Sequence, residues 1–140
     1  MQVRKAAISI MAASLCLAAC TQGNAASDEV ADAVQDQIVD LSVAELQNLQ
    51  ASGNVRLIDV RRDSEVAQGM IPGAEHIALD EFDPAKLDLS DGREIVLYCR
   101  AGVRSRVAGE RLSAHTGAPA KHLSGGIIDW KDAGEPVDRP

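Results

Sequence analysis

The sequence predicts a single α/β domain in which a parallel sheet is covered by helices on both faces. Apolar runs typical of strands alternate along the chain with segments of helical pattern, which favours parallel pairing. The chain has only one Trp, one Tyr and one Phe, so its core must consist of Val, Ile, Leu and Ala, which suits such a sheet. Its 140 residues are enough for one domain of this kind.

Residues 1–19 have the pattern of a bacterial export signal, because a basic start precedes an apolar stretch too short to span a bilayer comfortably. The stretch ends in Leu17-Ala18-Ala19-Cys20, which resembles the lipobox, whose cysteine is lipidated and becomes the first mature residue. An ordinary signal peptide cut nearby and a membrane anchor are the alternatives. We expect a lipid-anchored protein of the cell envelope that faces the periplasm. Thr21 in place of Asp favours the outer over the inner membrane.

Residues 20–36 are rich in Ala, Asp, Ser, Gln and Asn and predict a flexible tether after Cys20. The folded domain is expected over 37–140, beginning with a short strand at 37–39. A capping box of Ser42 and Glu45 then starts a helix that ends at Gly53.

A strand over 55–60 and a helix over 63–68 follow this first helix. A turn at Ile71-Pro72-Gly73-Ala74 leads into a small strand at 76–79. Residues 82–89 predict a mixed connection with one or two helical turns.

The second half of the domain contains a longer strand–loop–helix unit. The apolar run 94–98 predicts a strand, and a helical pattern follows it, with Gly117 just past the end. One face of this helix is formed by Val103, Val107, Ala108 and Leu112. A last strand is expected at 120–123, and a closing helix starts over 125–130 and ends by 133–136.

The loop between this strand and helix, Cys99 to Ser105, is the candidate site. Open α/β sheets bind ligands beyond the carboxyl ends of their strands. Loop amides and a helix start favour an anion, and Arg100 and Arg104 add positive charge. Such surroundings raise the fraction of a thiol present as the nucleophilic thiolate. A cysteine after a strand is often only a small buried hydrophobe, but that role requires neither the arginines nor Gly102.

The cysteine count supports a reactive thiol. Cys16 would leave with the signal and Cys20 would be lipidated, so Cys99 would be the free thiol in a compartment that favours disulfides. The net charge of −7 and the lack of a basic patch argue against nucleic-acid binding. We expect no metal and no cofactor, because no His and Cys residues have metal-ligand spacing. The three histidines are interpreted as ordinary surface or edge residues.

Four motifs in this order resemble the rhodanese homology domain in its single-domain form, over residues 37–140. They are Asp59-Val60-Arg61 with Glu65, Gly69-Met70-Ile71-Pro72-Gly73-Ala74, the loop Cys99–Ser105, and Gly125-Gly126 with Trp130, Gly134 and Pro136. Met70 stands where the family usually has histidine, which removes any case for a histidine base there.

The resemblance implies a five-stranded, mostly parallel sheet and a thiosulfate sulfurtransferase. Cys99 would take a sulfane sulfur from a small anionic donor such as thiosulfate, hold it as a persulfide and pass it to a thiophilic acceptor such as cyanide or a thiol. Arg104, with Arg100, would hold the donor. The substrate cradle would comprise Arg100, Ala101, Gly102, Val103, Arg104 and Ser105.

Other interpretations stay open. The same loop would serve a persulfide carrier or sulfide-sensing module that passes sulfur to a protein partner. A phosphatase or arsenate reductase would use Cys-x5-Arg, whereas Cys99 and Arg104 give the shorter Cys-x4-Arg. Asp59 and Arg61 either touch the loop from the neighbouring strand end or form a structural ion pair.

Lipidation predicts that the wild-type chain partitions with membranes and that Cys20→Ser does not, because several acyl chains give stable anchoring. Membrane fractionation of the two proteins checks this. Equal recovery of both in the soluble fraction would rule the anchor out.

Overall fold

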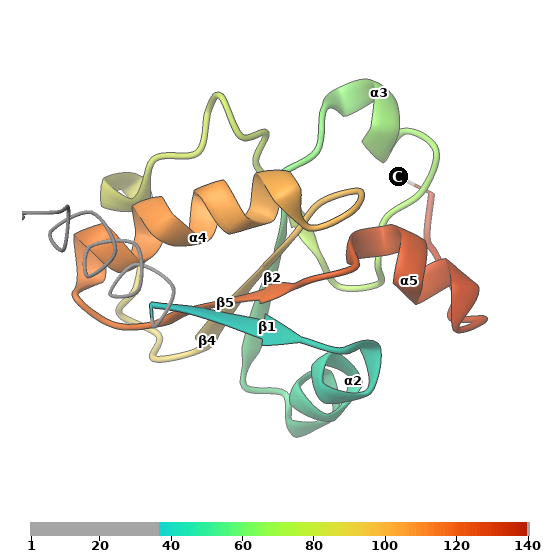
Figure 1. The fold of residues 1–140 in the computed structure, drawn as a ribbon, viewed down its shortest axis with the longest axis horizontal. Coiled ribbons are helices and arrows are strands. Elements are labelled where there is room, and N and C mark those ends of the chain that lie inside the picture. The colour runs from blue at the N-terminus through green and yellow to red at the C-terminus, as the bar shows by residue number, and fades with distance from the viewer. Residues whose placement is uncertain (1–36, 140) are drawn as a thin grey trace, which may run out of the picture.

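The computed structural model describes residues 37–139, so the predicted signal peptide, Cys20 and most of the tether lie outside the described residues. One five-stranded sheet runs through this part, in the order β1-β5-β4-β2-β3, with every neighbouring pair parallel. Its strands are β1 (Ile38–Leu41), β2 (Val55–Asp59), β3 (Glu75–His76), β4 (Glu94–Tyr98) and β5 (Ala120–Leu123). This confirms the predicted α/β fold (Figure 1).

Helices cover both faces of the sheet, as predicted (Figure 1). They are α2 (Val43–Ser52), α3 (Asp63–Val66), α4 (Val103–Thr116) and α5 (Gly126–Asp132), with a 3₁₀ turn η1 (Pro84–Lys86). On one face, Ile58 and Leu97 pack with Ala108 and Leu112 of α4. On the other face, the strand residues pack with Leu46 of α2 and with Ile127 and Trp130 of α5. Successive strand residues point to opposite faces, and the buried run Val96–Tyr98 of β4 therefore supplies apolar residues to both cores.

Most element boundaries match the sequence prediction. The strands at 94–98 and 120–123 agree residue for residue, and α2 has the predicted capping box of Ser42 and Glu45 with Gly53 at its end. The strand expected at 76–79 is shorter, because beyond His76 only isolated backbone bonds to β2 remain.

The interior face of α4 also differs from the pattern in the sequence. Ser105, Ala108 and Leu112 are buried, whereas Val103 is 74% exposed and Val107 lies at the border of exposure. The first turn of α4 therefore presents an apolar side chain to solvent beside the candidate loop.

The segment after α5 pairs with the segment between α3 and β3. Met70 and Asp138 form an antiparallel bridge in which each amide donates to the other residue's carbonyl, at 2.7 and 2.9 Å. Trp130 is buried, as expected for a core residue, and its indole N–H donates to the carbonyl of Pro136 at 2.7 Å. Within residues 37–139, no helix combines the length and the apolar character needed to cross a bilayer.

Candidate functional site

Cys99 directly follows β4, the strand with β2 on one side and β5 on the other. The residue is only 1% exposed. Four residues later α4 begins, so the strand, loop and helix are arranged as the sequence predicted. The thiol therefore lies at the carboxyl edge of the sheet, where open α/β folds place their ligands.

The first turn of α5 holds the loop from behind. The Ile127 amide donates to the Cys99 carbonyl at 2.9 Å, and the Ile128 amide donates to the Arg100 carbonyl at 3.2 Å. Gly126, at φ +62°, permits this approach, because a Cβ there would stand 2.5 Å from the backbone of both loop residues. These two bonds point the carbonyls of Cys99 and Arg100 toward α5 and fix the orientation of their peptide groups.

The amides of residues 100–105 are left free. Within the described part of the chain, none of them donates to a protein oxygen. Gly102 takes φ +85°, a left-handed conformation, and a Cβ on it would lie 1.8 Å from the Ser124 carbonyl oxygen. A run of unpaired amides that ends in a helix start is a binding site for a small anion.

Arg104 is fixed by an ion pair to α3. Its two terminal nitrogens donate to the two carboxylate oxygens of Glu65 at 2.6 and 2.7 Å, a bidentate arrangement. The Arg104 guanidinium lowers the pKa of Glu65 from 4.5 to about 2. The same contact raises the pKa of Arg104, whose charge also interacts with Cys99. The sequence predicted Glu65 as part of a motif, and nothing in the sequence indicated that it pairs with Arg104.

Asp59 and Arg61 form a buried ion pair at 2.6 Å beneath the loop. Arg61 also donates to the Gly69 carbonyl at 2.7 Å, and its guanidinium stands 5.8 Å from the centre of the Tyr98 ring. Burial, with the charge of Asp59, raises the pKa of Tyr98, so the phenol stays neutral. The pair is thus the structural one of the two alternatives, although Arg61 additionally lines the pocket above.

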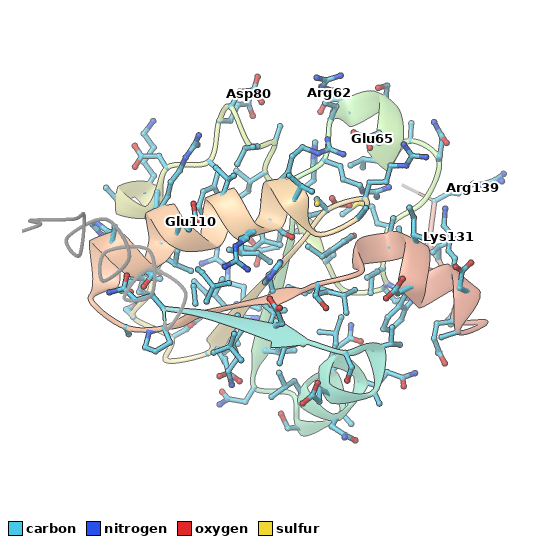
Figure 2. All side chains as sticks on the ribbon, viewed as in Figure 1. Arg62, Glu65, Asp80, Glu110, Lys131 and Arg139 are labelled. Atoms are coloured by element: carbon cyan, nitrogen blue, oxygen red, sulfur yellow. The ribbon has the colours of Figure 1, made fainter. Side chains whose placement is uncertain are left out.

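A pocket of about 680 Å³ opens over the loop, and most of its charged side chains are basic. Arg62, Lys131 and Arg100 line it. Figure 2 shows Arg62 beside α3 and Lys131 beside α5. These three cations form no ion pair with any residue of the segment 37–139. The sequence did not indicate Arg62 or Lys131, because their convergence depends on how α3 and α5 are placed.

The histidines divide into different environments, and the interpretation of all three as surface or edge residues is wrong for one of them. His122 lies on β5, between β1 and β4, and is only 3% exposed. His115 is exposed, and His76 is half-buried on β3. Across residues 37–139, no group of three His, Cys, Asp or Glu side chains is placed to hold a metal.

The described residues thus form a parallel α/β sheet with a buried cysteine in a loop of free amides at the carboxyl edge of a central strand. Residues 42–133 match the family described as the rhodanese-like domain. The chain therefore belongs to the rhodanese-like family.

Relatives of this chain include single-domain proteins and parts of longer ones. A protein named sulfurtransferase from Allochromatium vinosum is 35% identical over 94 residues, which cover 67% of this chain and 88% of that protein. An HTH-type transcriptional regulator from Mycobacterium tuberculosis is 38% identical over 97 residues, covering 68% of this chain but only 42% of the regulator. The structure of a human single-domain sulfurtransferase superposes with a TM-score of 0.58 at 32% identity, covering 66% of this chain and 95% of that one.

The close approach of α5 predicts that Gly126→Ala unfolds the loop. The new Cβ would collide with loop backbone, so we expect a loss of roughly 2–4 kcal/mol in unfolding free energy. Gly134→Ala is the matched control, because Gly134 has φ +82° but no atom within 4 Å of its Cβ position. Urea unfolding of both variants measures the difference, and equal losses would show that backbone strain alone matters.

The Glu65–Arg104 pair predicts a defined pH dependence of stability. The folded-state pKa of Glu65 is lowered from 4.5 to about 2, so the stability it contributes is present above about pH 4.5 and is lost as pH falls toward 2. Glu65→Gln should thus cost about 1 kcal/mol at pH 7, and the difference from wild type should vanish near pH 2.

Urea unfolding from pH 7 down to pH 3 checks this dependence. Glu75→Gln is the control, because Glu75 forms a similar bidentate pair with Arg56, at 2.7 and 2.9 Å, away from the loop. Only Glu65→Gln should also change the reactivity of the Cys99 thiol, because Arg104 belongs to the loop after Cys99 and Arg56 does not. A constant gap between wild type and Glu65→Gln at every pH would contradict the assignment.

Proposed function

We propose that this protein is a sulfurtransferase that moves a sulfane sulfur from thiosulfate or a similar donor through Cys99. The family match and the relatives named sulfurtransferases support sulfurtransferase activity in general. The donor and the persulfide step rest on one observation, the ring of undonated amides beside Cys99 beneath a cationic pocket.

The first half-reaction breaks the sulfur–sulfur bond of the donor. The Cys99 thiolate attacks the outer sulfur of thiosulfate, a new bond forms between the two sulfurs, and sulfite leaves with the electron pair of the broken bond. The free amides of residues 100–105 are placed to hold the transferred sulfur and its charge. Arg100 is exposed and unpaired in the described segment, so it is available to the sulfonate end of the donor.

The second half-reaction returns the thiolate. A thiophilic acceptor such as cyanide or a thiol attacks the outer sulfur of the Cys99 persulfide and leaves carrying it. Arg62, just before α3, and Lys131, on α5, both line the pocket and favour an acceptor with negative charge. No redox partner is needed, because each step exchanges one nucleophile for another at a divalent sulfur.

Two other functions follow from the same loop. A persulfide carrier or sulfide sensor would load Cys99 equally well and then pass the sulfur to a protein partner. A phosphatase or arsenate reductase is disfavoured, because the Cys-x4-Arg loop is one residue shorter than Cys-x5-Arg and forms a smaller ring of amides.

The proposed place of this reaction is the cell envelope. A lipid on Cys20 would hold the domain at a membrane surface facing the periplasm, with the outer membrane preferred, and the residues between Cys20 and β1 would serve as the tether. Donor and acceptor would then be solutes or proteins of that compartment.

Thiosulfate should add one sulfur atom to the wild-type chain, as seen in intact mass, and cyanide should remove it as thiocyanate. Cys99→Ser should show neither event while keeping its fold by circular dichroism. The same preparations are assayed on an aryl phosphate, on which we expect no meaningful hydrolysis. Phosphate hydrolysis without thiocyanate would overturn the proposal, and a stable persulfide that no small acceptor discharges would favour the carrier.

A further inference from the structure

A chain of hydrogen bonds leads from the loop to β1 through side chains that do not line the pocket. His122 Nε2 lies 2.7 Å from a carboxylate oxygen of Asp40 on β1, and His122 Nδ1 lies 3.0 Å from Ser105 Oγ on α4. Ser105 Oγ also lies 3.0 Å from the carbonyl oxygen of Gly102. Ser105 is fully buried and His122 is 3% exposed, whereas the Asp40 side chain at the far end is 59% exposed.

The Ser105 hydroxyl has one proton and two acceptors within reach. The Asp40 carboxylate accepts only, so His122 Nε2 carries a proton in both states of the ring. When the ring is neutral, Nδ1 has no proton and must accept from Ser105. When the ring is protonated, Nδ1 donates to Ser105 Oγ, and the hydroxyl then donates to the Gly102 carbonyl. The charge of His122 thus decides which bond Ser105 makes.

The Gly102 carbonyl matters because it shares a peptide plane with the Val103 amide. In a trans peptide the carbonyl and the N–H point in opposite directions, so a bond that fixes the carbonyl also aims the amide. That amide is one of the free donors of the loop. The Arg106 amide also donates to the Gly102 carbonyl, at 3.0 Å, so the Ser105 hydroxyl is a second donor to this oxygen.

We propose that His122 is a positioning residue of the sulfur site, whose protonation directs the Ser105 hydroxyl to the loop and so strengthens binding of the anionic donor. The inference rests on the proposed function for the identity of that donor. Neither His122 nor Asp40 lines the pocket, so neither touches the donor. A protonated ring beneath the loop also adds a positive charge, which acts in the same direction.

The charged groups around the ring come from two elements. Asp40 on β1 bonds it directly, and from α4 Arg106 lies 3.8 Å from the Asp40 carboxylate. Glu110, also on α4, is 3.7 Å from Arg106 and offsets its charge, and β4 presents the apolar Leu97 in register with His122. The nearest charged group is therefore the Asp40 carboxylate.

The test compares kcat/KM for thiosulfate between wild type and His122→Asn at about pH 5.5 and about pH 8, on either side of the ordinary histidine range. The ratio of the two enzymes cancels the ionisation of Cys99, which both share. We expect the ratio of kcat/KM of wild type to that of His122→Asn to be roughly two- to tenfold higher at the lower pH than at the higher pH. One buried hydrogen bond contributes about this much. His115→Asn, the same exchange at an exposed site on α4, should keep a constant ratio. A constant ratio for His122→Asn would overturn the proposal.

A second measurement tests the proposal on the wild-type protein, so it needs neither an activity assay nor a variant that folds. In wild type labelled with ¹⁵N-histidine, thiosulfate should shift the ring signals of His122, because sites coupled by binding affect each other reciprocally. His115 should not respond. Unchanged His122 signals at saturating thiosulfate would also overturn the inference. A chain that binds thiosulfate and shifts His122 but makes no thiocyanate would instead count against the proposed function.

Discussion

The site depends on how closely the first turn of α5 approaches the loop after β4. Because Ile127 and Ile128 occupy the carbonyls of Cys99 and Arg100, the loop cannot rotate its peptides, and its amides stay unpaired. Glycines at 102 and 126 are required for this arrangement, since any larger residue would collide with backbone. The ring of free amides is thus formed by main chain, and the contacts of α5 hold that main chain in place.

The basic side chains around this loop fall into two groups. Arg61 and Arg104 are each neutralised by a carboxylate, and the pair of Arg104 with Glu65 connects the loop to α3. Arg62, Arg100 and Lys131 keep their charge and face the pocket. A domain in a chain of net charge −7 can therefore present a local positive field, because its paired arginines supply rigidity and its unpaired cations supply attraction.

The parts of the fold that depend on residues close together in the sequence could be predicted from the sequence. The strand at 94–98 is buried on both faces, and the capping box of Ser42 needs only its neighbours, so both were evident from the sequence. The loop around Cys99 was evident for the same reason. The partner of Arg104 and the burial of His122 were not, because they depend on α3 and β1, which are distant in sequence. The edge strand β3 was too long in the prediction, since pairing with only one neighbour ends it early.

The sheet joins the two ends of the domain, since β1 pairs with β5 and Met70 bridges to Asp138. A chain that emerges from the ribosome with its N-terminus first leaves β1 without a neighbour until residue 123 has appeared. The hydrogen-bonding edge of β1 stays open during that interval, as is general for contacts of large sequence separation. The thiol can therefore be enclosed only after β5 and α5 have been synthesised, and a chain terminated before them would expose Cys99 together with an unpaired strand.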